Sequence, residues 1–360
     1  MRIVVLENGT LNHVVMIKNW IKIAEINNWK LVIFTSEECK SKLLKLDSKT
    51  IELKTFSSSS IKSFIDIIKF LKSSDMLVVN SMYLNYHFYI ALFTFHRNSY
   101  FSIHNVNKWF FSAPTNDNLV KKIIKSCVFK IIYRLAAGVF VNSDNMKAHI
   151  RKYDLKKRVE ILPFSLSLKE KKYPDIRNLT IVYPGIVSQQ RKRYGNFLKA
   201  ATLFPDIKFI LLGKLLDDTD FIADYIDVKK LDNVIYFPEY VEQEEFDLYM
   251  NECNLLFSDI NVKYGDEIYG QSKDSGVSYL MAEYCIPLLV NKDFNNLYHL
   301  HPNTLYFDDF DDIIQVIDSF SVMSQSKYDI IISNIDNARL KTNTDKLASN
   351  IRLFFLHSVK

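Results

Sequence analysis

Short apolar runs alternate with amphipathic stretches along the first half of the chain. The apolar runs have the length and the Val, Ile and Phe content of buried strands, as in RIVVLE (2–7), KLVIFT (30–35), DMLVVNS (75–81) and GVFVNS (138–143). The stretches between them carry apolar residues at helical spacing, as in 13–28, 61–74 and 119–137. Strands separated by helices of this length predict parallel β-α-β units.

A charged, proline-containing stretch, LKEKKYPDIRN (168–178), interrupts this pattern, and a second series of strand-like runs follows it. Those runs are LTIVYPG (179–185), IKFILLG (207–213), NVIYFPEY (233–240), NLLFSD (254–259) and IPLLVN (286–291). The tail from about residue 334 has helical spacing and no strand-like run. The pattern therefore predicts two parallel sheets, each flanked by helices.

We predict an α/β protein of two doubly wound, Rossmann-like domains that face each other across a cleft. Such domains bind ligands at the carboxyl ends of their strands. The predicted boundaries are 1–168 for the first domain, 169–179 for a linker, 180–335 for the second domain, and 336–360 for a C-terminal helix with the first domain as its expected packing partner.

Length and composition agree with two domains and restrict the cellular compartments in which the protein is expected. The chain has 360 residues, 48% of them hydrophobic, which suits two cores better than one. Its four cysteines are scattered without a C-x-x-C pair, which argues against a disulfide framework and a structural zinc site. Without a secretory pattern or an apolar run of about 18 residues, we expect a cytoplasmic protein, or one peripheral to the inner face of the cytoplasmic membrane.

The net charge of +5 is concentrated between Lys121 and Arg158, where only Asp144 and Asp154 oppose many basic residues. This indicates contact with an anionic surface or substrate. In the helix-like run within this region, one apolar face is predicted to pack on the sheet, and consists of Ile123, Ile124, Cys127, Val128, Ile131 and Ile132. The lysines off that face would remain available to anionic lipid headgroups. Nucleic-acid binding is not expected, because the basic residues lack interleaved aromatics.

A first candidate anion site lies in VYPGIVSQQRKRYGNF (182–197), where a strand passes through a loop into a helix. Gly185 permits close backbone approach, and Ser188, Arg191 and Lys192 stand at the helix entrance, which would suit a diphosphate. An ordinary strand–loop–helix junction with solvated basic residues explains this segment equally well, since one glycine is weak evidence for a phosphate-binding loop. The chain has no P-loop motif, which disfavours an NTPase.

A second candidate anion site lies in DEIYGQSKDSGVSYLMAEYCIPLLVN (266–291). A polar, glycine-containing loop enters a helix through small residues that would cradle an anion at the helix N-terminus, namely Ser275, Gly276, Val277 and Ser278. Tyr269 is placed to pack on a sugar or a base. The alternative is a helix capped by Asp274 or Ser275, but the long polar approach favours a binding role.

The order of GIVSQQRKR, FILLGK, NVIYFPEYVEQEEF and SGVSYLMAEYCIPLLV resembles the nucleotide-sugar domain of GT-B glycosyltransferases. The resemblance rests on ordered motifs in residues 180–291. For the rest of the chain it rests on the predicted architecture alone. It implies a donor diphosphate held by the two loops, a base near 237–241, and no cofactor beyond a UDP- or dTDP-linked sugar. It adds Gly213, Lys214, Glu239 and Tyr240 to the donor contacts.

One feature departs from the large retaining GT-B group, which carries a glutamate seven residues before a proline and another eight residues earlier. This chain has Leu280 and Ser272 at those positions, with Glu267 and Glu283 as candidate replacements. In its glycine at 276 and its apolar residue at 280, the chain is similar to the transferases of 4-acetamido-4,6-dideoxygalactose in enterobacterial common antigen synthesis.

Candidate catalytic groups follow strands of the first domain. The segment GTLNHV (9–14) resembles the G-T-x-x-H-V loop of the transferase that adds N-acetylglucosamine to a lipid-linked muramyl peptide. The resemblance implies that His13 is the base and that the acceptor contacts are made by Gly9, Thr10 and Asn12. A histidine titrates near neutrality, as a base for an acceptor hydroxyl must. The alternative is that His13 is only a polar surface residue.

Three other groups compete for the catalytic role: His104, at the end of another strand, and the carboxylates of Asp266 and Glu267. The alternative for His104 is a histidine that only makes structural hydrogen bonds. The alternative for Asp266 and Glu267 is an acidic pair solvated in a loop. No metal is required if backbone dipoles and Arg191 or Lys192 stabilise the leaving diphosphate. The lack of an obvious D-x-D motif agrees with that expectation.

Together these patterns predict a metal-independent glycosyltransferase of the hexosyltransferase type. The first domain would bind a glycan or polyprenyl-diphosphate-linked acceptor, the second a nucleotide-sugar donor, and the product would be a bacterial surface polysaccharide such as O-antigen, lipopolysaccharide or capsule. One alternative is a non-catalytic two-domain protein that binds a sugar or a nucleotide. The other is a nucleotide-sugar epimerase, or a phosphorylase, on the same scaffold.

Overall fold

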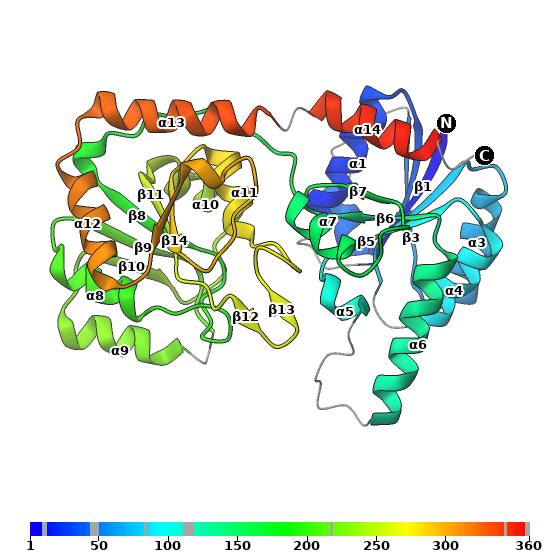
Figure 1. The fold of residues 1–360 in the computed structure, drawn as a ribbon, viewed down its shortest axis with the longest axis horizontal. Helices are drawn as coiled ribbons and strands as arrows, with labels where there is room; N and C mark the ends of the chain where they lie inside the picture. The colour runs from blue at the N-terminus through cyan, green and yellow to red at the C-terminus, as the bar shows by residue number, and fades with distance from the viewer. Residues whose placement is uncertain are drawn as a thin grey trace. The chain divides into compact units, whose positions relative to one another are not determined.

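The structure is a computed structural model that describes residues 1–8, 13–43, 50–82, 85–110, 119–216, 219–341 and 344–356. The chain divides into two compact units, shown in Figure 1. Unit 1 comprises Met1–Leu166 and Thr342–Lys360, and unit 2 comprises Ser167–Lys341. Each unit is built on its own parallel sheet, so each is described by itself.

Unit 1 contains a seven-stranded parallel sheet in the order β3-β2-β1-β4-β5-β6-β7. Its strands are β1 (Arg2–Glu7), β2 (Lys30–Thr35), β3 (Ile51–Thr55), β4 (Met76–Ser81), β5 (Ser99–Ile103), β6 (Gly138–Val141) and β7 (Val159–Ile161). Its helices are α1 (Val14–Ile26), α2 (Glu37–Leu43), α3 (Ile61–Leu71), α4 (Tyr86–Phe95), α5 (Val106–Phe110), α6 (Leu119–Leu135), α7 (Asp144–Arg151) and α14 (Thr344–Leu356).

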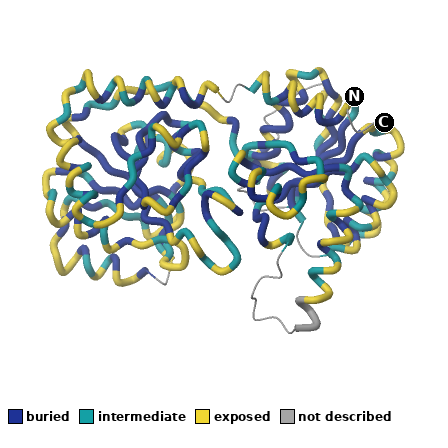
Figure 2. The backbone as a smooth tube through the Cα atoms, in the orientation of Figure 1, coloured by how far each residue is buried: buried dark blue, intermediate teal, exposed yellow. Residues whose placement is uncertain are grey.

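The central strands β1, β2, β4, β5 and β6 are buried on both faces of the sheet, which explains why they are mostly apolar (Figure 2). The edge strands β3 and β7 are only partly buried and carry charged residues. Alternate residues of β1 point to opposite faces: Ile3 and Val5 enter one core cluster and Val4 and Leu6 the other. The first cluster also holds α14, whose Phe355 ring stacks on Trp20 of α1 with the ring centroids 6.3 Å apart.

Unit 2 contains a six-stranded parallel sheet in the order β10-β9-β8-β11-β14-β15, and a separate two-stranded antiparallel sheet, β12-β13. Its strands are β8 (Thr180–Pro184), β9 (Lys208–Lys214), β10 (Val234–Phe237), β11 (Leu255–Ser258), β12 (Lys263–Tyr264), β13 (Glu267–Ile268), β14 (Leu288–Asn291) and β15 (Thr304–Phe307). Its α-helices are α8 (Gly195–Leu203), α9 (Asp220–Lys229), α10 (Gln243–Glu252), α11 (Gly276–Tyr284), α12 (Phe310–Ser321) and α13 (Gln325–Arg339), and its 3₁₀ turns are η2 (Ile176–Asn178) and η4 (His301–Asn303).

Two parallel sheets flanked by helices confirm the predicted α/β class of two Rossmann-like domains. In the part of the chain that the structure describes, no helix combines the length and the apolar character that a membrane span requires.

The segment that follows Leu166 belongs to unit 2. Lys169 pairs with Asp247, and its backbone N–H donates to the carbonyl of Glu283 at 2.9 Å. Lys171 pairs with Asp336 at 3.1 Å. These contacts, with η2, fix residues 167–178 on the second sheet's helices.

The predicted packing face of α6 is wrong at four of its six positions, because Ile123, Ile124, Cys127 and Ile131 are exposed. Ile132 is buried and Val128 packs on the core, as predicted. The other buried positions are Phe129 and, just after the helix, Ala136. The Phe129 ring stacks on Trp109 with the centroids 4.6 Å apart and meets Tyr86 edge-on at 5.1 Å. The largest apolar side chain of the helix therefore sets its rotation, and the isoleucine stripe faces outward.

Candidate functional site

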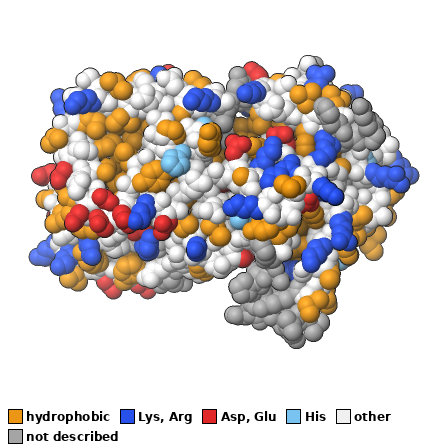
Figure 3. Space-filling view, viewed as in Figure 1, with side chains coloured by type: hydrophobic (Ala, Val, Ile, Leu, Met, Phe, Trp, Pro, Cys, Tyr) orange, Lys and Arg blue, Asp and Glu red, His pale blue; other side chains and the backbone are white. Residues whose placement is uncertain are grey.

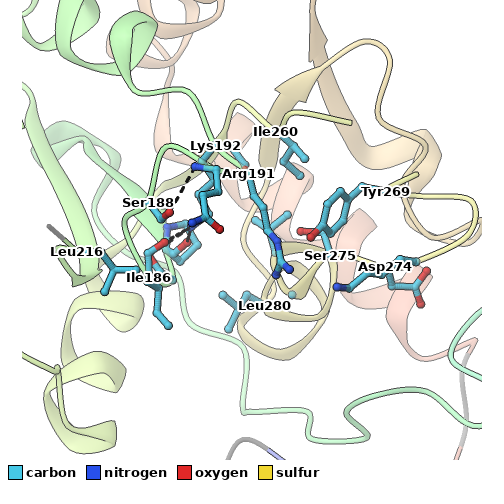
Figure 4. Close-up of a pocket in the computed structure, with 17 residues that line it drawn as sticks. Ile186, Ser188, Arg191, Lys192, Leu216, Ile260, Tyr269, Asp274, Ser275 and Leu280 are labelled. Atoms are coloured by element: carbon cyan, nitrogen blue, oxygen red, sulfur yellow. Dashed lines mark hydrogen bonds between the residues drawn. The ribbon is translucent and has the colours of Figure 1, made fainter. Parts of the chain in front are cut away.

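The described residues of unit 2 form a pocket of about 540 Å³ at the carboxyl ends of β8 and β11 (Figure 4). One wall is the loop from Pro184 to Lys192, and the other is the segment from Lys273 to Leu280 that opens α11. Ser258, Ile260, Leu216 and Tyr269 complete the lining. The two sequence segments predicted to bind one anion therefore enclose one cavity.

The loop between β8 and α8 is anchored to the end of β11. The backbone N–H of Arg193 donates to the carbonyl of Asp259 at 2.9 Å, and that of Asn261 donates to the carbonyl of Arg191 at 2.9 Å. The buried Asp259 carboxylate pairs with Arg193 at 2.7 Å and accepts from Asn196 at 3.1 Å. Burial raises the pKa of Asp259, and the Arg193 guanidinium opposes that shift. Helix α8 begins at Gly195, directly after this anchored loop.

Lys192 turns its ammonium group back beneath the loop. Its Nζ donates to the carbonyls of Pro184 at 2.6 Å, Gly185 at 3.2 Å and Ile186 at 3.3 Å, as the dashed lines of Figure 4 indicate. Burial lowers the pKa of Lys192 to about 7. In its protonated form, Lys192 fixes the loop and adds positive charge to the pocket wall.

Arg191 lies on the pocket side of the same loop (Figure 4). Its Nε is 3.6 Å from Glu267, which also pairs with Lys273 at 2.5 Å and accepts from the Tyr269 hydroxyl at 2.8 Å. Burial disfavours the charge of Glu267, but Lys273, Tyr269 and Arg191 outweigh it and lower its pKa. Glu267 is therefore a partly buried, ion-paired carboxylate on the β12-β13 hairpin, which does not fit the alternative of a solvated loop carboxylate.

The N-terminus of α11 forms the opposite wall. Ser275 is its N-cap residue and makes no side-chain cap hydrogen bond, while Asp274 accepts from the Tyr279 hydroxyl at 2.7 Å. A Cβ added to Gly276 would meet nothing within 4 Å, so the backbone there is open to a ligand. The first N–H groups of an α-helix have no acceptor within the helix and attract anions.

The pocket brings together most of the predicted donor residues: Gly185, Ser188, Arg191, Lys192, Tyr269, Ser275, Gly276 and Val277. The others are absent from its described lining. Ser278 is buried, Tyr240 is 67% exposed, and Lys214 pairs with Glu239 at 3.4 Å. Gly213 has a packing role, because an added Cβ would lie 2.6 Å from the backbone of Gly185, itself at φ +88°.

Neither position of the missing glutamate pair holds a carboxylate. Leu280 lines the pocket, and Ser272 is buried, where its hydroxyl accepts from the backbone N–H of Ile268 at 2.8 Å. Ser272 thus stabilises the hairpin that carries Glu267. Its side chain has a local structural partner in place of a sugar contact.

A second polar cluster lies at the carboxyl ends of β1, β4 and β5 in unit 1. His13 Nδ1 is 3.2 Å from the buried Glu7 carboxylate, which also accepts from the Ser81 hydroxyl. The His104 ring meets the His13 ring edge-on with the centroids 5.6 Å apart. His104 Nε2 lies 2.7 Å from the carbonyl of Asn80. The two candidate histidines are therefore neighbours.

Some of these groups were not anticipated from sequence. Glu7 ends the apolar run RIVVLE and gave no signal except its place at a strand end, and Asp259 ends NLLFSD in the same way. Lys273 lies in the polar stretch before α11, where the sequence does not distinguish it from a solvated lysine. The predicted acceptor residues Gly9, Thr10 and Asn12 lie outside the described residues, while Asp266 is described but not among the pocket-lining residues.

Among the described residues, no group of three or more His, Cys, Asp or Glu side chains is arranged to hold a metal ion. The pocket contains cationic groups, a helix N-terminus and an apolar wall. That arrangement suits an anionic ligand with an apolar portion.

No protein-family model matches the chain, and no curated protein matches it in sequence. Solved structures share its fold at low sequence identity. HepE of Anabaena, crystallised with UDP and glucose, has a TM-score of 0.71 and 13% identity, with 100% of both chains covered. Sucrose-phosphate synthase of Thermosynechococcus elongatus has a TM-score of 0.68 and 12% identity, covering 99% of this chain and 98% of that one.

TarM is a third similar structure, with a TM-score of 0.66, 10% identity and 98% of each chain covered. The fold that this chain shares with these proteins is the GT-B fold of glycosyltransferases.

Proposed function

We propose that this protein is a glycosyltransferase that moves a sugar from a nucleoside diphosphate to a hydroxyl of a glycan or lipid-linked glycan. The observation that carries the proposal is the unit 2 pocket, in which Arg191 and Lys192 lie opposite the N-terminus of α11. Two cations and a row of backbone N–H groups complement a diphosphate.

The same groups would promote departure of the diphosphate. Negative charge grows on the leaving oxygen as the bond to the sugar breaks, and donors already fixed in place stabilise that charge most effectively. The Asp259 anchor and the three carbonyl contacts of Lys192 hold the loop before any ligand arrives. A metal ion would then be unnecessary.

The unit 1 cluster supplies a base for the acceptor. Because Nδ1 of His13 faces the Glu7 carboxylate, that nitrogen would carry the proton and leave Nε2 to accept one from the acceptor hydroxyl. The carboxylate would then stabilise the imidazolium that forms. Glu7 is a positioning residue in this scheme, and His13 is the catalytic residue.

The similar structures support a nucleotide-sugar donor, because HepE was crystallised with UDP and glucose and with UDP-glucose. A bacterial surface polysaccharide is the proposed product, assembled at the cytoplasmic face of the membrane on a polyprenyl-diphosphate-linked acceptor. The sequence likeness to transferases of 4-acetamido-4,6-dideoxygalactose makes dTDP-linked deoxysugars the first donors to test beside UDP-hexoses.

Thermal unfolding in the presence of UDP, dTDP, GDP and CMP tests the donor site. A ligand at 100 times its Kd should stabilise the protein by about 2.7 kcal/mol. We expect UDP or dTDP to raise the Tm of the wild type and of Arg177→Ala, a control that removes an exposed arginine outside the pocket. Arg191→Ala should lose the shift. If no nucleotide raises the Tm, the proposed donor site is wrong.

A further inference from the structure

Helix α6 presents a continuous stripe to solvent on unit 1. Ile123, Ile124 and Ile131 are 56%, 58% and 44% exposed. The exposed positions of the described part of the helix are Ile123, Ile124, Cys127, Lys130, Ile131 and Arg134. With about 100° between successive residues, these positions share roughly one third of the helix circumference. The stripe therefore combines branched aliphatic side chains with two cations.

The opposite face of α6 fixes this orientation. Ile132 and Ala136 belong to the unit 1 core, and Phe129 is 3% exposed between Trp109 and Tyr86. Turning the isoleucines inward would expose these three side chains. The outward stripe is thus a consequence of core packing.

The turn after α7 continues the same surface. Leu155 is 80% exposed in this turn, and Lys152 and Lys156 are also exposed. Two contacts hold the turn against the C-terminal end of α6: the Tyr133 hydroxyl donates to Asp154 at 3.1 Å, and Lys157 donates to the carbonyls of Tyr133 and Ala136. The exposed groups of the turn therefore lie beside the C-terminal end of α6, and we call the α6 stripe and this turn together the α6 face.

This face is cationic. None of the ion pairs among the described residues uses Lys130, Arg134, Lys152 or Lys156. The Asp154 carboxylate is turned inward, where it accepts the backbone N–H groups of Lys156 at 2.8 Å and Lys157 at 3.0 Å. Figure 3 shows Lys and Arg side chains beside hydrophobic ones along this helix.

Many of the other basic residues of this region hold the fold together. Arg151 donates to the carbonyls of Leu155 and Lys157 at 2.8 and 2.7 Å, and Arg158 donates to the carbonyl of Phe354. Lys147 lies 3.8 Å from Glu160. The positive charge available to a partner is therefore concentrated on the α6 stripe and the turn.

We propose that this face, formed by the α6 stripe and the 152–156 turn, binds an anionic lipid bilayer. The isoleucines and Leu155 would enter the interfacial region while the four cations contact headgroup phosphates. Apolar side chains flanked by Lys and Arg characterise helices that lie on membranes. Protein–protein interfaces, by contrast, are depleted in lysine and enriched in aromatic residues at their centres. The proposal does not depend on the donor chemistry.

Cosedimentation of the full chain with vesicles tests the proposal. We expect the wild type to bind vesicles of equal parts phosphatidylglycerol and phosphatidylcholine, and to bind phosphatidylcholine alone much more weakly. Lys130→Gln with Arg134→Gln should weaken binding about fivefold per cation removed. Ile124→Ser with Ile131→Ser should weaken it on the order of tenfold. Added salt should reduce binding of the wild type.

Matched controls come from α13 in unit 2. Lys327→Gln and Ile330→Ser remove exposed side chains of the same kinds and should bind vesicles like the wild type. The Tm reports folding of every variant. If the wild type does not bind anionic vesicles, or if the α6 variants bind as well as the controls, the proposal is wrong. A wild-type dimer that the α6 variants abolish, without vesicle binding, would instead assign the face to a second copy.

Discussion

Lys192 holds its ammonium group beneath a loop that faces the pocket. A charged ammonium satisfies the three carbonyls it contacts, but burial opposes the charge and lowers the pKa of Lys192 to about 7. A bound diphosphate would favour the protonated form. Nucleotide binding should therefore take up a proton, and affinity should fall as the pH rises above 7.

The pH dependence of the nucleotide Kd between pH 7 and 9, measured by calorimetry, checks this prediction. We expect the wild-type Kd to rise by up to about tenfold per pH unit. Lys192→Met should bind more weakly and with no such slope, while Lys199→Met, on the exposed side of α8, should behave like the wild type. A Lys192→Met variant with an unchanged slope would contradict the assignment.

The same lysine links pH to folding. The unfolded chain binds its proton up to about pH 10.5 and the folded chain only up to about pH 7. The unfolding free energy contributed by this group should therefore rise with pH between those values and fall as the pH is lowered towards 7. Urea unfolding at pH 7 and 9, with Lys192→Met as the comparison, measures the difference.

Glu7 acts on His13 from a fully buried position. Glu7→Gln keeps the size of the side chain but removes the charge that would stabilise an imidazolium. We expect the turnover rate to fall at least about 100-fold, with KM for the donor and the nucleotide-induced Tm shift unchanged. Glu52→Gln, an exposed change on β3, is the control. A variant with wild-type turnover would exclude the Glu7–His13 pair from the mechanism.

At the scale of elements, the β8–α8 loop depends on the end of β11. Asp259→Ala would remove the partner of Arg193 and Asn196 and leave both without the acceptor that fixes the loop. We expect a loss of about 1–3 kcal/mol in unfolding free energy, and weaker nucleotide binding because Arg191 and Lys192 lose their fixed positions. Denaturant unfolding and calorimetry on the same samples measure both effects.

The control for that prediction is Glu252→Ala, which breaks an exposed pair with Lys208 in the same unit. Exposed pairs contribute about 0–1 kcal/mol, so little change is expected. If Asp259→Ala matched this control in both measurements, the anchor would have no role in forming the donor site.

The α6 helix shows where periodicity stops being informative. Apolar residues surround most of this helix, so spacing alone permits more than one buried face. The choice depends on tertiary partners, and Trp109 and Tyr86 are not adjacent to α6 in sequence. The β12-β13 hairpin was missed for a related reason, since two-residue strands give no alternating pattern.

At the scale of the whole molecule, both parallel sheets could be predicted because most of their strands are apolar runs separated by helix-like stretches. The meeting of the 185–192 and 275–277 segments in one pocket followed from the rule that parallel strands end at a common edge. Glu7 and Asp259 could not be recognised as partners, because single carboxylates at strand ends reveal nothing of the side chains that fold against them.

The measurement that tests the account most directly is the release of nucleoside diphosphate from nucleotide sugars in the absence of acceptor. A glycosyltransferase with this pocket should release UDP or dTDP slowly to water, and Arg191→Ala should lower that rate on the order of 100-fold by removing a fixed cation from the leaving group. Arg177→Ala should leave the rate unchanged. If the wild type binds a nucleotide sugar tightly but releases no diphosphate above the rate without protein, the account is contradicted, and the chain is a two-domain binding protein on the same fold.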